Sequence, residues 1–284
     1  MTNYGMQPLD PTGPFNIGAM YKPRRLVVAT PAHHGYHDNF YGSMLGLQKL
    51  CLERGIPMEP SRLIGHSSIA HARTTMMRDF LYKTDGTDLI FIDSDQGFDP
   101  QDVLDMVESD LPIVGAVCCQ KKYDWEAIQR AARQASLAPH PQPDALALAG
   151  AVFTFDTGAA GNDVDLTERK AVPVRRVGFG LTVIKRVVIE TLAARGTPKV
   201  ELAGGPDFPP LCNTRVVQSA DRPGKWEWLT EDYAFCSRAA DVGFKTYLAW
   251  WTKTTHTGDH VFKADLVTAA EMLGGVSQDQ RDSE

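Results

Sequence analysis

Asp88-Leu-Ile-Phe-Ile-Asp-Ser-Asp95 is the segment that says most about the fold of this chain. Residues 89–92 form an apolar run that is typical of a strand buried on both faces of a sheet. A turn containing Gly97 is expected next. Asp99-Pro100 then has the pattern of a helix start, with an N-cap followed by proline at the first helical position. A buried strand followed closely by a capped helix indicates an α/β fold.

Two carboxylates, Asp93 and Asp95, end this strand. Residues two apart in an extended segment point to the same side, so both side chains can reach one ion or its hydration shell. Carboxylate oxygens suit a hard divalent cation such as Mg²⁺ or Mn²⁺. Ligands of open α/β sheets also bind at the carboxyl ends of strands, where this pair lies. Capping of the following turn is the alternative role for the two aspartates.

The rest of the chain alternates between strand and helix patterns. Strands are expected over residues 26–30, 113–118, 145–155, 172–177 and 245–251, and helices over 40–54, 67–83, 126–136, 182–195 and 230–243. Short connections in this order predict a Rossmann-like, mostly parallel central sheet with helices on both faces.

Bulk composition restricts the class of protein. At 284 residues the chain can form one large domain or two small ones, and its net charge of -6 gives no global field for binding bare nucleic acid. The five cysteines lack a zinc-type Cys-x-x-Cys spacing and are expected to be reduced, mostly buried thiols. No apolar segment approaches the length of a membrane span, so a cytoplasmic location is expected.

Several cationic or imidazole side chains fall where an anionic ligand would lie. Arg73 is close to the apolar stripe of its helix, so it needs a partner, either a carboxylate of the protein or a phosphate of a ligand. Lys121 and Lys122 follow the next strand and either face phosphates or lie in solvent. His33 and His34 follow the first strand, where plain polar surface is the alternative to metal or phosphate binding.

Candidate acceptor contacts come from one aromatic residue and two glycines. Trp125 lies just beyond the two lysines, where its ring either stacks on a base or sugar or packs within the protein. Gly178 and Gly180 allow a ligand to approach the backbone closely, or they simply form a tight strand-to-helix turn.

Thr230-Glu-Asp-Tyr233 is expected to open a helix, with Thr230 as its N-cap. Acidic residues in a first turn interact favourably with the helix dipole, which is a sufficient structural reason for Glu231 and Asp232. The functional alternative is a general base that removes a proton from an attacking hydroxyl. His256 follows the last expected strand, where it could complete a metal site begun by the two aspartates.

Together these motifs resemble those of the nucleotide-sugar glycosyltransferases with the GT-A fold, over roughly residues 25–260. The loop with Thr30 and Pro31 resembles the family's first, nucleotide-facing loop. Ala72-Arg73 resembles its Ala-Arg-Asn motif beside the diphosphate, although Thr74 here replaces the asparagine.

The remaining motifs of the family follow in the same order. Asp93-Ser94-Asp95 resembles the Asp-x-Asp strand end, Glu231-Asp232 resembles the acidic pair that faces the acceptor, and His256-Thr-Gly258 resembles the late His-x-Gly. The most similar members are small glycosyltransferase-like proteins of phages, large viruses and bacteria.

The resemblance implies a metal-dependent transfer of a sugar from a nucleotide diphosphate, expected to be UDP, to an acceptor hydroxyl. Mn²⁺ or Mg²⁺ would be held by Asp93, Asp95 and His256 and would neutralise charge on the departing phosphate. Glu231 and Asp232 would be catalytic, with Asp232 as the base if the anomeric configuration inverts, which we favour, or as an orienting group if it is retained. Donor contacts are expected from Thr30, Pro31, Arg73, Asp93, Ser94, Lys121 and Lys122.

A single GT-A domain would then span most of the chain. It is expected at residues 23–262, with a nucleotide- and metal-binding half at 23–160 and an acceptor half at 161–262. Residues 1–22 are expected to form an irregular arm, and residues 263–284 a short helix and a frayed tail.

Three other classes deserve comparison. A haloacid-dehalogenase-like, Mg-dependent phosphatase also places Asp-x-Asp after a strand, but that family expects Thr or Val where Gly97 stands and has its motif on the first strand. Sugar nucleotidyltransferases need an early Gly-x-Gly-Thr-Arg loop, which is missing. A non-catalytic nucleotide-sugar binder is the third class, and the presence of both acidic motifs and the late histidine argues against it.

The sequence leaves the acceptor open among a glycan, a protein, a small molecule and a modified base of phage DNA. A DNA acceptor would require a local basic face on this acidic chain. The candidates for such a face are Arg169, Lys170, Arg175, Arg176, Lys185 and Arg186. A solvated amphipathic face is the alternative for these six cations.

Overall fold

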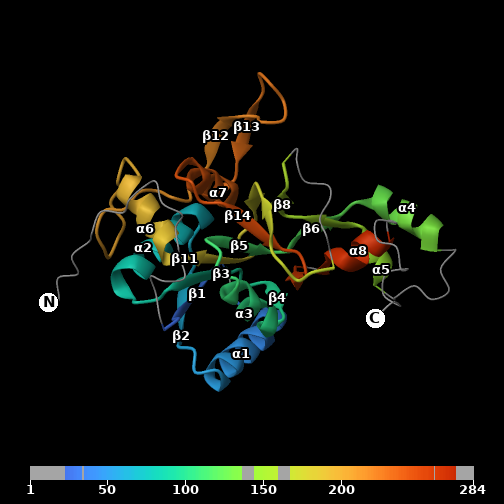
Figure 1. The fold of residues 1–284 in the computed structure, drawn as a ribbon, viewed down its shortest axis with the longest axis horizontal. Helices are drawn as coiled ribbons and strands as arrows, with labels where there is room; N and C mark the ends of the chain where they lie inside the picture. The colour runs from blue at the N-terminus through green and yellow to red at the C-terminus, as the bar shows by residue number, and fades with distance from the viewer. Residues whose placement is uncertain (1–22, 34, 136–143, 159–166, 259, 273–284) are drawn as a thin grey trace.

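The computed structural model describes residues 23–33, 35–135, 144–158, 167–258 and 260–272 (Figure 1). The expected N-terminal arm at 1–22, His34, and the tail beyond residue 272 lie outside the described residues. No helix in the described part is long and apolar enough to cross a membrane.

A seven-stranded sheet forms the centre of the molecule, in the order β2-β1-β3-β11-β5-β14-β9. Its strands are β1 (Leu26–Ala32), β2 (Met58–Ile64), β3 (Asp88–Ile92), β5 (Ile113–Ala116), β9 (Val172–Val174), β11 (Leu181–Lys185) and β14 (Thr246–Ala249). β1 pairs in parallel with β2 and β3, and β5 pairs in parallel with β14, whereas β11 and β9 run in the opposite direction. The predicted α/β class, with a Rossmann-like, mostly parallel central sheet, is confirmed.

Helices cover both faces of this sheet (Figure 1). One face carries α1 (Asp38–Glu53) and α3 (Pro100–Glu108), and the other carries α2 (Ile69–Lys83), α6 (Arg186–Arg195) and α7 (Glu231–Asp241). The predicted caps are present: the side chain of Ser68 accepts from the amide of His71, and that of Asp99 accepts from the amide of Gln101, with Pro100 opening α3.

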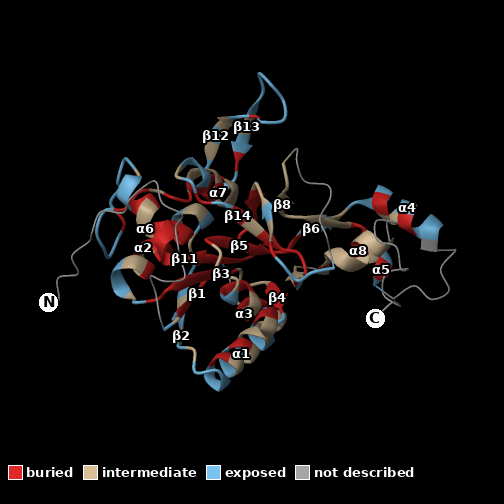
Figure 2. Ribbon diagram, in the orientation of Figure 1, coloured by how far each residue is buried: buried red, intermediate tan, exposed pale blue. Residues whose placement is uncertain are grey.

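The core lies in the central strands and the helix faces turned towards them (Figure 2). Leu89, Ile90, Phe91 and Ile92 are all 0% exposed, as expected for a strand with neighbours on both faces. Burial of each such side chain contributes about 1.5–3 kcal/mol relative to exposure. β3 is therefore a rigid base for the loop that follows it.

Smaller sheets and helices surround the carboxyl edge. β4 (Gln96–Phe98), β15 (Lys253–Thr257) and β16 (Val261–Asp265) form a three-stranded sheet. The other pairs are β6 (Cys119–Tyr123) with β7 (Ala151–Phe153), β8 (Phe155–Asp156) with β10 (Arg176–Val177), and β12 (Arg215–Gln218) with β13 (Trp226–Leu229). The remaining helices are α4 (Trp125–Ala135), α5 (Ala145–Ala149) and α8 (Leu266–Met272).

Three expectations about local structure were wrong. Residues 181–185 form strand β11 instead of the start of a helix, because this β-branched run is buried between β3 and β5, and the helix begins only at Arg186. Residues 145–149 form helix α5 instead of strand, in keeping with their Ala-Leu composition. Gly97 lies in the short strand β4 instead of a turn.

All five cysteines are free and buried, as predicted. Burial raises the pKa of the Cys119 thiol to about 11 and those of Cys118, Cys212 and Cys236 to about 12. These thiols are therefore protonated at neutral pH.

Candidate functional site

The two aspartates after β3 turn towards different partners. The Asp93 carboxylate accepts a hydrogen bond of 2.7 Å from Nη2 of Arg73, whereas the Asp95 carboxylate accepts one of 2.6 Å from Nζ of Lys121. The backbone is fixed at both residues, since the Asp93 amide donates to Gly180 O at 2.9 Å and the Thr257 amide donates to Asp95 O at 2.8 Å. The loop therefore presents two carboxylates in two different directions.

Arg73 joins the Asp-x-Asp loop to the start of α7. Its side chain is 3% exposed and lies over the rings of Phe91 and Phe179, at 5.9 and 5.5 Å from their centroids. One terminal nitrogen donates to Asp93 and the other donates to Glu231. Of the two partners considered for Arg73, the structure contains the carboxylate, and the burial of the guanidinium leaves little surface for a phosphate.

Burial and charge act in opposite directions on this cluster. Burial alone would lower the pKa of Arg73, but the carboxylates of Asp93, Glu231 and Asp232 outweigh it and raise the pKa above its ordinary value. Burial raises the pKa of Asp93 and of Glu231, against the opposing effect of the Arg73 charge. The cluster is held together by charge pairing in a poorly solvated place.

His256 lies beside Asp95 because of strand pairing. In the antiparallel register of β15 and β4, His256 is opposite Gln96, and its Nε2 lies 3.4 Å from Asp95 Oδ1. Its Nδ1 lies 2.7 Å from Cys119 O, and because a carbonyl only accepts, Nδ1 carries the proton. In the neutral ring the lone pair is then on Nε2, on the side of Asp95.

The charge state of Asp95 is well defined. Burial by itself raises the pKa of this carboxyl, but hydrogen bonds with His256 and Lys121 outweigh it and hold the pKa at about 2. The hydrogen bond to Asp95 occupies Nε2 of His256, so a cation would have to replace the proton of that bond. The carboxylate and the imidazole nitrogen would then form a donor set that fits Mn²⁺ and, less closely, Mg²⁺.

The three predicted metal ligands are not all brought together. Asp95 and His256 are adjacent, but Asp93 is turned to Arg73. Within the described ranges, no group of three or more His, Cys, Asp or Glu side chains lies together in a way that could hold a metal ion. The protein thus offers two neighbouring ligands at this place.

Asp232 lies in the first turn of α7, directly after Glu231, which is bound to Arg73. Its Oδ1 accepts from the Thr230 hydroxyl at 2.6 Å and from the Tyr233 amide at 2.7 Å. Thr230 is the N-cap residue by position, but its hydroxyl bonds Asp232 instead of capping a backbone amide. Asp232 is half-buried, with one carboxylate oxygen fixed by the protein.

The predicted donor contacts are divided between the site and its surroundings. Thr30 is buried within β1, and Pro31 lines a cavity of about 170 Å³ at the carboxyl end of that strand. The Ser94 carbonyl accepts from the His37 amide at 3.0 Å, which ties the loop after β1 to the Asp-x-Asp loop. Lys122, unlike Lys121, forms no ion pair with any described residue.

The predicted acceptor contacts do not line an open space together. A Cβ at Gly180 would lie 3.2 Å from both Cys118 Sγ and Gln96 Nε2, and one at Gly178 would lie 2.8 Å from Thr154 Oγ1. The two glycines thus serve close packing beside Asp93. Trp125 is 70% exposed and packs edge-on against Tyr123, beside a separate cavity of about 540 Å³.

The six cations proposed as a basic face do not form one. Lys185 pairs with Asp88 and Asp110, Arg186 bonds backbone carbonyls of the α2 end, and both are buried. The other paired members are Arg169 with Asp102, Arg175 with Asp221 and Arg176 with Glu227. Lys170 is exposed and forms no ion pair with any described residue, but a single lysine is not a basic face, so the pairing of the other five removes the observation on which a DNA-binding face was based.

Sequence reasoning missed two contributors to the site. The Cys119 carbonyl orients His256, and a backbone atom leaves no signal in side-chain motifs. Gln96 is 1% exposed beside Asp95, and its Oε1 has no hydrogen-bond partner among the described residues. The strand that contains Gln96 has only three residues and pairs with the distant β15, so the sequence around Gln96 does not reveal it.

No family model and no curated protein matches this chain. Among solved structures, A197 from STIV has a TM-score of 0.47 at 16% identity, over 85% of this chain and 94% of that one. A glycosyltransferase involved in glycosylation of the major capsid of PBCV-1 has a TM-score of 0.27 at 8% identity, over 58% of this chain and 63% of that one. The inositol-1-phosphate CTP transferase from T. maritima has a TM-score of 0.36 at 9% identity, over 88% and 96%. At these identities the likenesses concern the course of the backbone.

Proposed function

We propose that this chain is a metal-dependent glycosyltransferase, which moves a sugar from a nucleotide diphosphate, UDP in the first instance, to an acceptor hydroxyl. The proposal is carried by one observation, the convergence of Arg73, the Asp93–Asp95 loop, Glu231–Asp232 and His256 at the carboxyl end of β3. These side chains come from distant parts of the sequence and match the motifs of one family in order and type.

Asp95 and His256 would hold the cation, and the diphosphate and water would supply its other ligands. The site favours positive charge, because the carboxylates of Asp93, Asp95, Glu231 and Asp232 outnumber the cations Arg73 and Lys121. A bound cation would supply charge stabilisation to the departing diphosphate. Lys121 is placed to exchange its contact with Asp95 for a phosphate oxygen.

The nucleobase would occupy the small cavity at the carboxyl end of β1. Its walls include Pro31, Leu63, Ile69 and Ala72, and His66 adds a polar ring at its edge. His33 and Ser67 also line it, so apolar side chains could pack on the faces of a planar base while polar groups bond its edge. The cavity is formed by the ends of β1 and β2, the loop after β2 and the first turn of α2, the helix that also carries Arg73.

Asp232 would take the proton from the acceptor hydroxyl. Its Oδ1 is occupied by two donors of the protein, so the other carboxylate oxygen is the one for the acceptor. Glu231, bound to Arg73, positions this turn of α7 relative to Asp93. An inverting reaction is favoured, because a fixed base beside the acceptor is what inversion requires.

Asp232→Asn tests this role. General-base catalysis typically contributes about 10²- to 10⁴-fold, so release of nucleotide diphosphate from the sugar donor should fall by that factor while donor affinity stays unchanged. Glu53→Gln, at the exposed end of α1, serves as the control. Full activity of Asp232→Asn with unchanged donor binding would remove Asp232 from the base role.

A further inference from the structure

The hairpin of β12 and β13 presents two exposed tryptophans on one face. Trp226 and Trp228 are 65% and 74% exposed, and residues two apart on a strand point to the same side. Across the hairpin, Trp228 pairs with Val216, which is 53% exposed, and Trp226 pairs with Gln218. Large aromatic surface left in water is unusual and marks a binding surface.

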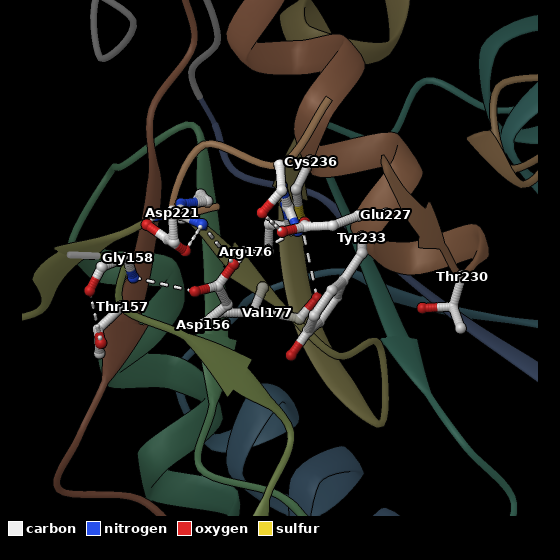
Figure 3. A network of polar contacts seen from close by, with 12 residues as sticks. Asp156, Thr157, Gly158, Arg176, Val177, Asp221, Glu227, Thr230, Tyr233 and Cys236 are labelled. Carbon is white, nitrogen blue, oxygen red and sulfur yellow. Dashed lines mark hydrogen bonds and ion pairs between the residues drawn. The ribbon is translucent and has the colours of Figure 1, made fainter. Parts of the chain in front are cut away.

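The opposite face of the hairpin is anchored to the rest of the molecule (Figure 3). Glu227 lies between the two tryptophans in sequence, pairs with Arg176 at 3.2 Å and accepts from the Ser219 hydroxyl. Arg176 also pairs with Asp156 at 3.4 Å and lies 5.8 Å from the ring centroid of Tyr233 on α7. The indole rings are therefore carried by a hairpin whose position is fixed by charge pairs.

A second set of contacts ties the hairpin to α7. Arg215 on β12 pairs with Asp241 and donates to the Ser237 hydroxyl at 3.2 Å. β13 leads directly into α7 through Leu229, which is 2% exposed. The element that carries the candidate base and the element that carries the rings are thus connected, and the β12–β13 hairpin projects from the sheet in Figure 1.

The backbone of Trp228 lies near that of the candidate base. Trp228 precedes Asp232 by four residues, and a fully extended chain spans at most ~3.3–3.6 Å per residue, so their Cα atoms are no more than about 14 Å apart. A chain molecule stacked along the two rings could extend from the hairpin to Asp232.

Charge decides which kind of chain molecule fits. A nucleic acid needs cations that remain available to its phosphates, in addition to stacking surfaces. Arg175, Arg176 and Arg215 are each already paired with carboxylates. Arg222, which is 68% exposed and 3.9 Å from Glu227, and the exposed Lys225 lie together in the turn of the hairpin, so they do not form a row of cations along the two rings. The aromatic face is also narrow and flanked by polar groups such as Gln218, unlike the broad apolar face that a bilayer would need.

We propose that the Trp226–Trp228 face binds the acceptor of the transfer as a neutral carbohydrate chain. Sugar rings have apolar C–H faces and hydroxyl rims, so they stack on indole while the rim stays solvated or bonds side chains such as Gln218. This inference rests on the proposed function, because it names the acceptor of that reaction.

Binding of the full chain to an array of neutral and acidic oligosaccharides tests the proposal, followed by titration of the neutral glycans that bind. Trp226→Ala with Trp228→Ala should weaken this binding by at least about tenfold, whereas the double Trp→Phe variant, which keeps two rings, should retain most of it. Tyr41→Ala removes an aromatic ring that is 59% exposed on α1 and should change nothing. Thermal melts check that each variant is folded.

Absence of neutral glycan binding by the unchanged chain, or equal binding by the double alanine variant, would overturn the proposal. The same follows if a thymidine oligonucleotide or phosphatidylcholine vesicles bind instead and lose binding in that variant. Nucleotide titration with Mn²⁺ distinguishes failure of the acceptor inference from failure of the proposed function. If the unchanged chain binds nucleotide but its glycan affinity is the same as that of the double alanine variant, only the acceptor inference fails. If the unchanged chain binds no nucleotide, the proposed function fails.

Discussion

At the scale of single residues, Arg73 connects more of the site than any one motif does. It is buried over two stacked phenylalanine rings and holds Asp93 and Glu231 together, one from each acidic motif. Arginine suits this place because its planar group holds two donor nitrogens apart, one for each carboxylate, whereas a lysine donates from a single nitrogen.

Replacement of Arg73 by Met should destabilise the chain by about 3–5 kcal/mol, because it leaves two poorly solvated carboxylates without their cation. Urea unfolding measures the change. Arg54→Met removes an exposed ion pair with Glu108 and should cost less than about 1 kcal/mol. Adding Asp93→Asn and Glu231→Gln to Arg73→Met should recover part of the loss, and equal stabilities for Arg73→Met and Arg54→Met would contradict the assignment.

At the scale of elements, agreement between sequence and structure depends on what determines each element. α2 and α3 begin where their caps predict, since capping is a local interaction. β11 was misread because a short apolar run fits both a strand and a buried helix, and its partners β3 and β5 decide between them. The β12–β13 hairpin was missed, although Pro223-Gly224 followed by the alternation Trp-Glu-Trp-Leu229 is a hairpin signal.

Two glycines of α1 provide a matched test of helix packing. A Cβ at Gly42 would meet no atom within 4 Å, so Gly42→Ala should raise the free energy of unfolding by about 0.5–1 kcal/mol through helix propensity. A Cβ at Gly46 would lie 2.8 Å from Pro100 Cγ at the start of α3, so Gly46→Ala should lower it by about 1 kcal/mol or more. Equal changes in chemical denaturation would contradict the described packing of α1 on α3.

At the scale of the whole molecule, the fold class and the order of the site motifs could be predicted, but the directions of the side chains could not. Strand geometry suggested that Asp93 and Asp95 face one ion, yet the loop has already left the strand there. The divergence depends on Arg73 from α2 and on the pairing of β15 with β4, which no local pattern contains. The basic stretch at residues 169–186 likewise does not form a basic surface, because Arg169, Arg176 and Lys185 pair with carboxylates that are distant in sequence.

The buried thiols make a global prediction about alkaline pH. Burial raises the pKa of Cys212 and Cys236 from 9.0 to about 12 in the folded chain. Their protonated forms therefore contribute stability that is fully present below pH 9 and is lost as the pH rises towards 12. Denaturation at pH 8, 9 and 10 should show falling stability, with a shallower fall in Cys236→Ala, and rapid alkylation of the native chain at pH 8 would contradict this burial.

Calorimetric titration with UDP, GDP and their sugar conjugates, in Mn²⁺ and then in EDTA, tests the proposed donor site most directly. We expect that one nucleotide binds in Mn²⁺, and that binding is lost in EDTA and in Asp95→Ala but kept in Asp85→Ala, which changes an exposed carboxylate paired with Arg25. If no nucleotide binds with Mn²⁺ present, the transferase proposal is wrong and a phosphatase assay becomes the next step.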